Sequence, residues 1–439
     1  MSTHIITRKL QLKVVGGKEE TARAYKWIRD CMESQSRAMN YYMSFLYYEA
    51  IRDMLDKDGK KEFNKFFQRT GTGKLENAYP SDVKFPTGYR MGLLGTKVNK
   101  DFSNDMKKGL EYGNRSLRTY KKDSPALVHN CQINFYHGYD SDDEFYEKLY
   151  TERNLKLYMD FVDNIKFKVL IGDAKDPKRG EFEKIFRHMT VDKKVDSSWK
   201  VCDSSIGLIK KGKYDKIMLN LSICVPSIKK ELDENTVVGA DLGLAIPAVC
   251  ALNNNERARK DIGSFDDFTR VRTRMQSQYR RLQSSLSSVS GGHGREKKMV
   301  ALDRLTKHER NWVHNYNHFV SKEVIKFALD NKAKYINLED LSGYSDAEKG
   351  GFVLRNWSYY ELQTMIKNKA SRFGIEVRFV NSKYTSQTCS CCGERGIRAK
   401  QAEFTCQNPE CKNYGKVVNA DFNAARIIAM SEDFTDKTK

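Results

Sequence analysis

The chain has 439 residues, 39% of them hydrophobic and 31% charged, which is enough for about two to four domains with cores of their own. Lys and Arg number 77 against 57 Asp and Glu, and the net charge of +20 favours a polyanion such as nucleic acid over a merely soluble basic protein. No apolar run approaches the ~20 residues of a membrane span, and the N-terminus lacks the order of a secretion signal, so we expect a cytoplasmic protein with no membrane partner.

The first half of the chain is typical of a β domain that a mostly helical insertion interrupts. Residues 5–15 alternate apolar and polar side chains, which predicts a strand, and residues 19–55 have helical spacing. Residues 57–125 are rich in Gly, Lys, Arg and aromatic side chains, for example at 115–122. That composition fits a surface that contacts phosphates and stacks on bases. It fits solvent-exposed helix faces equally well, so both interpretations stay open. Strand signals dominate between 126 and 235.

The second half of the chain combines buried strands with long helices. The expected elements, in chain order, are a strand, turn and strand over 237–252, helices over 264–288 and 295–331, a strand over 334–338, a helix over 357–373, a strand over 375–380 and a helix that begins near Asp421.

Three carboxylates, Asp241, Glu339 and Asp421, stand where these strands and the last helix begin or end. Each alone has a structural explanation, since Asp241 could shape a turn and Asp421 could be a helix N-cap. Together they favour catalysis, because hard divalent cations prefer carboxylate oxygens and two Mg²⁺ ions flank the phosphate in a phosphodiester nuclease. Their strand and helix contexts indicate an RNase H-like fold. Asp340 could equally be a cap, and strand alternation turns it away from the face that Glu339 uses.

Four cysteines between the last two carboxylates have the spacing of a zinc ribbon. Cys389 and Cys392 form a C-x2-C knuckle, and Cys406 and Cys411 form a C-x4-C arm. Four thiolates fit one closed tetrahedral Zn²⁺ site, which is structural because no position is left for water. Disulfides are the weaker alternative in a cytoplasmic chain. Cys391 falls between the first pair and is interpreted as a non-ligand.

The motifs of residues 236–430, taken in order, resemble the RuvC domain with inserted zinc ribbon of the transposon-encoded TnpB proteins and of the miniature type V-F CRISPR effectors. The first half is similar to that family only in layout, and the C-x4-C arm departs from the commoner C-x2-C. The matching strings are Gly239-Ala-Asp241-Leu-Gly-Leu, Asn337-Leu-Glu339-Asp-Leu, Thr385-Ser-Gln-Thr-Cys389-x2-Cys392-Gly and Asn419-Ala-Asp421-Phe-Asn-Ala-Ala.

The resemblance implies a multidomain α+β protein. It would have an RNase H-like RuvC nuclease domain with an inserted zinc ribbon, and an N-terminal β-barrel-like wedge domain that carries a helical recognition lobe. The implied boundaries are 1–16 and 126–235 for the wedge domain, 17–125 for the lobe, 236–383 and 419–439 for the RuvC domain, and 384–418 for the target-nucleic-acid-binding ribbon.

The resemblance also implies an RNA-guided DNA endonuclease of the prokaryotic cytoplasm. The guide RNA would choose the target DNA by base pairing, and the protein would read a short T-rich flanking motif. One RuvC site would then cut both strands of that DNA. An arginine of the ribbon would lie near the scissile phosphate, with Arg398 the first candidate and Arg395 the second. The effectors use a homodimer on one guide RNA whereas TnpB acts alone, and the large helical lobe favours the effector.

Two other functions stay open from the sequence. One is a non-catalytic zinc-ribbon regulator that binds nucleic acid and uses the acids structurally. The other is an unguided RNase H-like transposase or resolvase, which would cut without any bound RNA.

Overall fold

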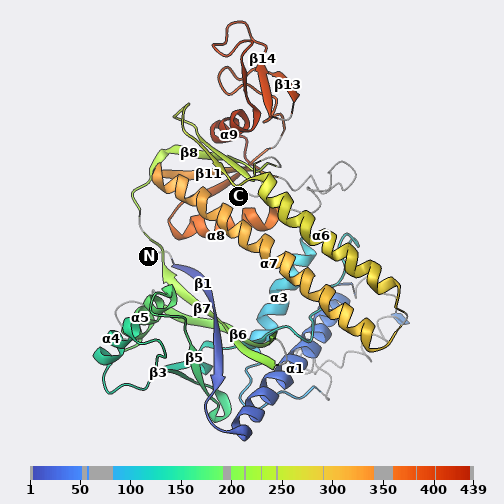
Figure 1. Ribbon diagram of the computed structural model, residues 1–439, viewed down its shortest axis with the longest axis vertical. Helices are drawn as coiled ribbons and strands as arrows, with labels where there is room; N and C mark the ends of the chain where they lie inside the picture. Colours follow the sequence, from blue (N-terminus) through green and yellow to red (C-terminus); the bar gives the residue numbers. More distant parts are fainter. Residues whose placement is uncertain are drawn as a thin grey trace. The chain divides into compact units, whose positions relative to one another are not determined.

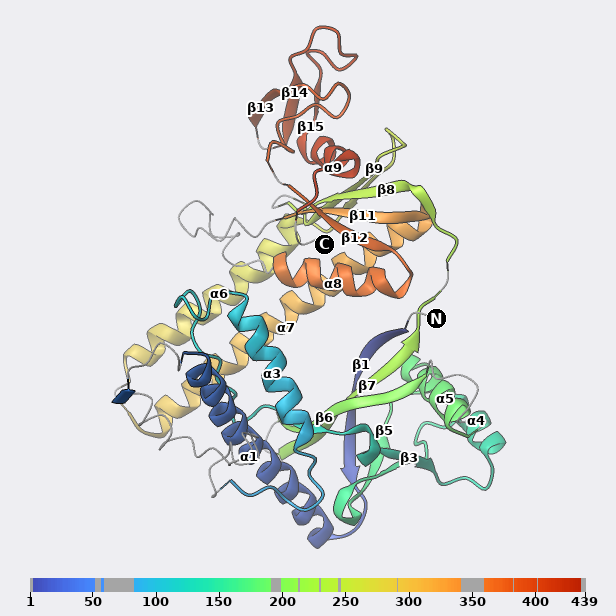
Figure 2. The same ribbon diagram turned by 180° about the vertical axis from the view of Figure 1, so that it is seen from behind.

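The computed structural model describes residues 3–51, 57–58, 83–190, 199–211, 214–228, 230–243, 246–289, 291–340, 359–381, 383–400 and 402–435. Residues 59–82 of the basic, aromatic-rich segment lie outside this description. The chain divides into two compact units, with the boundary between Pro226 and Ser227 (Figures 1 and 2). Within the described residues, no helix is long and apolar enough to cross a lipid bilayer.

A seven-stranded antiparallel sheet forms the centre of the first unit, in the order β2-β6-β7-β1-β5-β4-β3. The predicted N-terminal strand is confirmed, because β1 lies inside this sheet and pairs with both β5 and β7. Leu10 and Leu12 point toward the core, and the residues between and beside them on the opposite face are polar apart from Ile5. The strands are β1 (Thr3–Val14), β2 (Ala126–Val128), β3 (Asn134–His137), β4 (Leu157–Asp160), β5 (Lys166–Leu170), β6 (Lys200–Lys211) and β7 (Tyr214–Pro226).

The helices of the first unit pack on this sheet and on one another. The first half of α1 (Lys18–Ile51) buries Trp27 and Ile28 in the core of the sheet, and its second half packs on α3 (Gly92–Met106). Two further helices, α4 (Asp142–Thr151) and α5 (Pro177–Thr190), stand where only strands were predicted.

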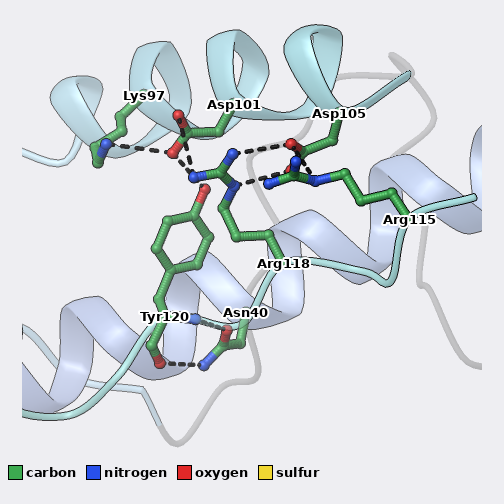
Figure 3. A network of polar contacts seen from close by, with 7 residues as sticks. All are labelled: Asn40, Lys97, Asp101, Asp105, Arg115, Arg118 and Tyr120. Atoms are coloured by element: carbon green, nitrogen blue, oxygen red, sulfur yellow. Dashed lines mark hydrogen bonds and ion pairs between the residues drawn. The ribbon is translucent and has the colours of Figure 1, made fainter. Parts of the chain in front are cut away.

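A polar network fastens the segment 115–120 to α1 and α3 (Figure 3). The buried Asp105 accepts from Arg118 at 2.8 and 2.9 Å and pairs with Arg115 at 2.8 Å. Asn40 bonds both backbone groups of Tyr120. Both arginines of this basic segment are therefore paired with Asp105 of the protein itself, which neither sequence interpretation anticipated.

The second unit contains a mixed five-stranded sheet in the order β10-β9-β8-β11-β12. The central strands β8 and β11 are parallel, as are β11 and β12, whereas β9 and β10 run antiparallel to their neighbours. The strands are β8 (Asp233–Asp241), β9 (Ala248–Leu252), β10 (Arg259–Ile262), β11 (Ala333–Glu339) and β12 (Glu376–Val380). The predicted domain boundary at 235/236 falls inside β8, because that strand already begins at Asp233.

Helices cover both faces of this mixed sheet (Figures 1 and 2). One face packs against α6 (Phe265–Ser287), α7 (Gly292–Asp330) and α8 (Tyr359–Arg372). The other face packs against α9 (Ala420–Met430), with Ala425 against Val249 and Ala251. A small three-stranded sheet of β13 (Gly396–Lys400), β14 (Glu403–Cys406) and β15 (Val417–Asn419) is inserted between β12 and α9.

Candidate functional site

Asp241 and Glu339 end the two central strands of the mixed sheet. Leu338 of β11 pairs with Ala240 of β8 in parallel register, so the next residue on each strand is one of the two acids. Because parallel strands end at the same edge of a sheet, both carboxylates lie at one edge.

The helix that carries Asp421 is held on the same face as these two carboxylates. Gly239 lies two residues before Asp241, and a Cβ atom there would come within 2.0 Å of the Ala425 carbonyl oxygen of α9. Asn337 lies two residues before Glu339, and its Nδ2 donates to the Ile428 carbonyl oxygen of α9 at 2.9 Å. Since side chains two apart in a strand share a face, both acids point to the side on which α9 packs.

Asp421 occupies the first turn of α9 and is not its N-cap. The cap is Asn419, whose side chain accepts from the Phe422 N–H at 2.9 Å. The interpretation of Asp421 as a simple N-cap is therefore wrong, and its carboxylate does not cap the helix. Asp340 follows the last residue of β11, and its backbone N–H donates to the Val380 carbonyl oxygen at 2.9 Å, while the direction of its side chain away from Glu339 stays a prediction.

Two of the carboxylates act electrostatically on the third, Asp241. Burial raises the pKa of Asp241 well above its usual range, and the negative charges of Glu339 and Asp421 raise it further. Burial also raises the pKa values of Glu339 and Asp421. The effect of both charges on Asp241 places Glu339 and Asp421 near that carboxyl, and clustered acids with raised pKa values are common at functional sites.

The donor chemistry of this carboxylate site fits hard divalent cations, since all three groups present carboxylate oxygens. The carboxylate oxygens are more widely spaced than the cysteine sulfurs, because among the described residues the four cysteines are the group whose ligand atoms all lie within 4.8 Å of one another.

Two neighbouring side chains hold the carboxylates from the zinc-ribbon segment. The Thr385 hydroxyl donates to Oε1 of Glu339 and opposes the rise in that carboxyl's pKa. Arg398 of β13 donates from Nη2 to Oδ1 of Asp421 at 3.2 Å. Of the two candidate arginines, the structure brings Arg398 to the carboxylates and places the Arg395 guanidinium 3.8 Å from the centre of the Tyr384 ring.

Two residues at the start of α8 were missed by the sequence reasoning. Burial raises the pKa of Tyr359, and the nearby Asp241 charge raises it further, which places this phenol beside the carboxylate site. Gln363 donates from Nε2 to the Glu339 carbonyl oxygen at 2.8 Å. No spacing or motif in the sequence marks either residue.

Cys389, Cys392, Cys406 and Cys411 come together as predicted. The Cys389 and Cys411 sulfurs are 3.9 Å apart, and those of Cys392 and Cys406 are 3.6 Å apart. Thiolates about 2.3 Å from a tetrahedral ion are separated by roughly 3.8 Å, so the geometry fits one Zn²⁺. The Asn413 N–H donates to the Cys411 sulfur and lowers the pKa of that thiol to about 7, which favours the metal-binding thiolate.

Asn423 of α9 links the cysteine knuckle to the carboxylate site. Its Oδ1 accepts from the Ser390 N–H at 2.9 Å, and its Nδ2 donates to the Thr388 carbonyl oxygen at 2.7 Å. Because Asn423 lies two residues after Asp421 in the same helical turn, the knuckle and the third carboxylate are held by one rigid element.

Comparisons with known sequences match parts of this chain. The family model for the Cas12f1-like TNB domain matches residues 359–428. The chain is 33% identical over 244 residues to the CRISPR-associated endodeoxyribonuclease Cas12f1 of Sulfoacidibacillus thermotolerans, which covers 55% of this chain and 56% of that protein. A TnpB-like protein of Methanocaldococcus jannaschii is 30% identical over 112 residues, covering 24% of this chain and 40% of that protein. The chain thus matches only about half the length of the Cas12f1 relative.

One solved structure shares the fold over the whole chain. A chain in a cryo-EM structure of a Cas12f1–sgRNA–target DNA complex superposes with a TM-score of 0.64 and 19% identity, covering 99% of this chain and 100% of that chain. The mixed α/β fold of the protein is therefore that of a Cas12f1 chain.

Proposed function

We propose that this chain, which is similar to the miniature type V-F CRISPR effectors and to TnpB, is an RNA-guided DNA endonuclease. The observation that carries the proposal is the meeting of Asp241, Glu339 and Asp421 on one face of the mixed sheet. One RuvC site would cut both strands of guide-matched DNA beside a short T-rich flanking motif.

In this proposal the three carboxylates hold two Mg²⁺ ions. Bound there, the ions would supply an activated water on one side of the scissile phosphate and charge stabilisation of the leaving oxygen on the other. Thr385 would keep the Glu339 carboxylate in one orientation. Arg398 would place its guanidinium near the scissile phosphate, because this planar cation matches phosphate geometry. The four cysteines would hold one structural Zn²⁺ that keeps Arg398 in position.

The domain roles follow the same proposal. The unit up to Pro226 would contain the wedge domain and the recognition lobe, and the unit from Ser227 would contain the RuvC domain with its target-binding ribbon. Guide RNA and both strands of target DNA would be the partners, on one copy of the protein or on two.

A basic groove between α6 and α7 supports a nucleic-acid partner. Two adjoining hollows of about 530 and 510 Å³ share Gln278 and His308 in their linings. Exposed arginines line them, together with apolar side chains such as Trp312, a combination that suits phosphates and stacked bases. The groove arginines are Arg270, Arg274, Arg281 and Arg304.

The test begins with RNA that copurifies with the full chain and is sequenced. A structured scaffold with a variable guide is expected, and the loaded protein should then cut a matched plasmid in Mg²⁺. Asp241→Ala should abolish cutting without loss of bound RNA, because it removes only a proposed cation ligand. Cutting that needs no RNA would indicate the unguided nuclease, and RNA binding without any cutting would indicate the regulator.

A further inference from the structure

One guanidinium acts on all three carboxylates. Arg398 bonds Oδ1 of Asp421 at 3.2 Å, and its charge also lowers the pKa values of Asp241 and Glu339 against the effect of burial. The Arg398 side chain is 27% exposed and that of Asp421 only 10%, so this ion pair is partly shielded from water. Pairs of this kind interact more strongly than fully exposed ones.

The backbone around Arg398 is irregular in a way that directs its side chain. Ile397 of β13 pairs with Thr405 of β14, and the next pair is Lys400 with Glu403. Between these two pairs β13 advances by three residues and β14 by only two. The extra residue makes a β-bulge that contains Arg398. Such bulges re-aim a side chain and are common next to active sites.

The ion pair and a bound cation compete for the same oxygens. Three neighbouring, partly buried carboxylates repel one another unless a positive charge is present, and an arginine remains protonated at any working pH. An oxygen of Asp421 that accepts a hydrogen bond from Arg398 offers less of its charge to a metal ion.

We propose that Arg398 is an internal counter-cation of the carboxylate site, which offsets part of its negative charge in the metal-free protein and releases Asp421 when a divalent cation binds. This inference rests on the proposed function, because it requires the three carboxylates to be cation ligands. Release would leave the guanidinium beside the site and available to an anion such as a phosphate, so the same side chain would serve the metal-free and the metal-bound protein in turn.

The test is equilibrium binding of Mn²⁺ to the zinc-loaded full chain, followed by electron paramagnetic resonance of the free ion. Arg398→Gln is expected to bind Mn²⁺ roughly tenfold more tightly than the unsubstituted protein, since a charge-assisted competitor has been removed. Lys400→Gln is the matched control: this lysine lies on the same strand, loses the same charge and pairs with Glu403 at 3.0 Å. Its affinity for Mn²⁺ should change less than twofold.

The outcomes separate this inference from the function on which it rests. Unchanged or weaker Mn²⁺ binding by Arg398→Gln, or a gain no larger than that of Lys400→Gln, would overturn the counter-cation role. If Asp241→Asn bound Mn²⁺ as well as the unsubstituted protein, the carboxylates would not be the cation ligands and the proposed function itself would fail. Zinc content of one ion per chain verifies that the ribbon is folded in each variant. Arg398→Lys, which keeps the charge but loses the planar fork, should bind Mn²⁺ with intermediate affinity.

Discussion

Single residues next to the carboxylates determine where these groups meet. Gly239 lets the backbone of α9 approach β8, and Asn337 bonds the last turn of the same helix. Neither residue carries charge or chemistry of its own. Each lies two positions before an acid at the end of its strand. The strand that carries the acid therefore also determines how closely α9, which carries Asp421, packs on the sheet.

Gly239→Ala should therefore disturb both stability and cutting. The added methyl would lie 2.3 Å from the Ala429 nitrogen as well as against Ala425, and backbone atoms cannot move aside as a flexible side chain can. We expect a loss of about 1–3 kcal/mol in unfolding free energy, measured by urea denaturation, and slower cleavage. Gly294→Ala is the control, because nothing lies within 4 Å of that position in α7. Equal stability of the two variants would contradict the close approach.

The site residues differ in how much of their role the sequence reveals. Asp241 and Glu339 are polar residues that end apolar runs, and the cysteine spacing is distinctive, so these could be predicted. Tyr359 could not, because it reaches Asp241 only through the packing of α8 on the sheet. The contact of Thr385 with Glu339 likewise depends on where the chain turns after β12.

Asp105 is the residue through which α3 holds the segment 115–120. Hydrogen bonds from Arg118 hold the pKa of the Asp105 carboxyl below its usual 3.8. Because the pKa of Asp105 is lower in the folded than in the unfolded chain, the network stabilises the fold fully at a pH above the unfolded pKa. This stabilisation is lost as the pH falls through the folded pKa. The network should therefore stabilise the first unit at neutral pH and fail only in acid below about pH 4.

Asp105→Asn should lower the unfolding free energy of the first unit by about 1–3 kcal/mol at pH 7, because two arginines lose a buried partner. The difference from the unsubstituted protein should shrink at pH 3, because the unfolded Asp105 carboxyl is then mostly protonated and the ion network contributes less to the unfolding free energy. Thermal unfolding at the two pH values measures this. Glu33→Gln removes only an exposed pair with Lys122 and should change stability by less than about 0.5 kcal/mol. A pH-independent effect of Asp105→Asn would exclude the ion network as its cause.

At the scale of elements, we expect the segment of the four cysteines to depend on the proposed Zn²⁺ more than any other part of the second unit does. Its sheet has only three short strands, and its core consists of Phe404, Ala420 and the cysteines themselves. Removal of Zn²⁺ by a chelator should unfold residues 385–415 and abolish cutting, while β1 and β7 stay folded. Hydrogen exchange read by mass spectrometry distinguishes these regions. Protection or cutting that survives loss of the metal would contradict the structural role of the site.

The elements of the second unit were easier to predict than those of the first. Helices α6 and α7 are long and periodic, and each central strand places buried apolar residues just before its acid, Val238 and Ala240 in β8 and Ile336 and Leu338 in β11. Helix α4 has only ten residues, and its signal is local: Ser141 caps it by accepting from the Glu144 N–H. That Ser-x-x-Glu pattern could have identified the helix, whereas the surrounding strand signals hid it.

At the scale of the whole molecule, the excess of basic residues attracts a polyanion most strongly where exposed basic side chains are concentrated. Many cations are already engaged, as Arg115 and Arg118 are with Asp105, and they add little to the attraction of a polyanion. Exposed arginines that line a groove are different, since a phosphate can reach them and displace their counterions. The α6–α7 groove is therefore where we expect part of the net charge of +20 to contact nucleic acid.

The double substitution of Arg274 and Arg281 by Gln tests this placement. Affinity for a guide-length RNA, measured by filter binding over a range of salt concentrations, should fall, and the slope of log K against log salt should become shallower by about 1.4–1.8. The matched control replaces Arg280 and Lys307, which are exposed on the same two helices but do not line the groove. If both pairs changed the slope equally, the RNA would be responding to overall charge alone, and the groove would have no special role in binding.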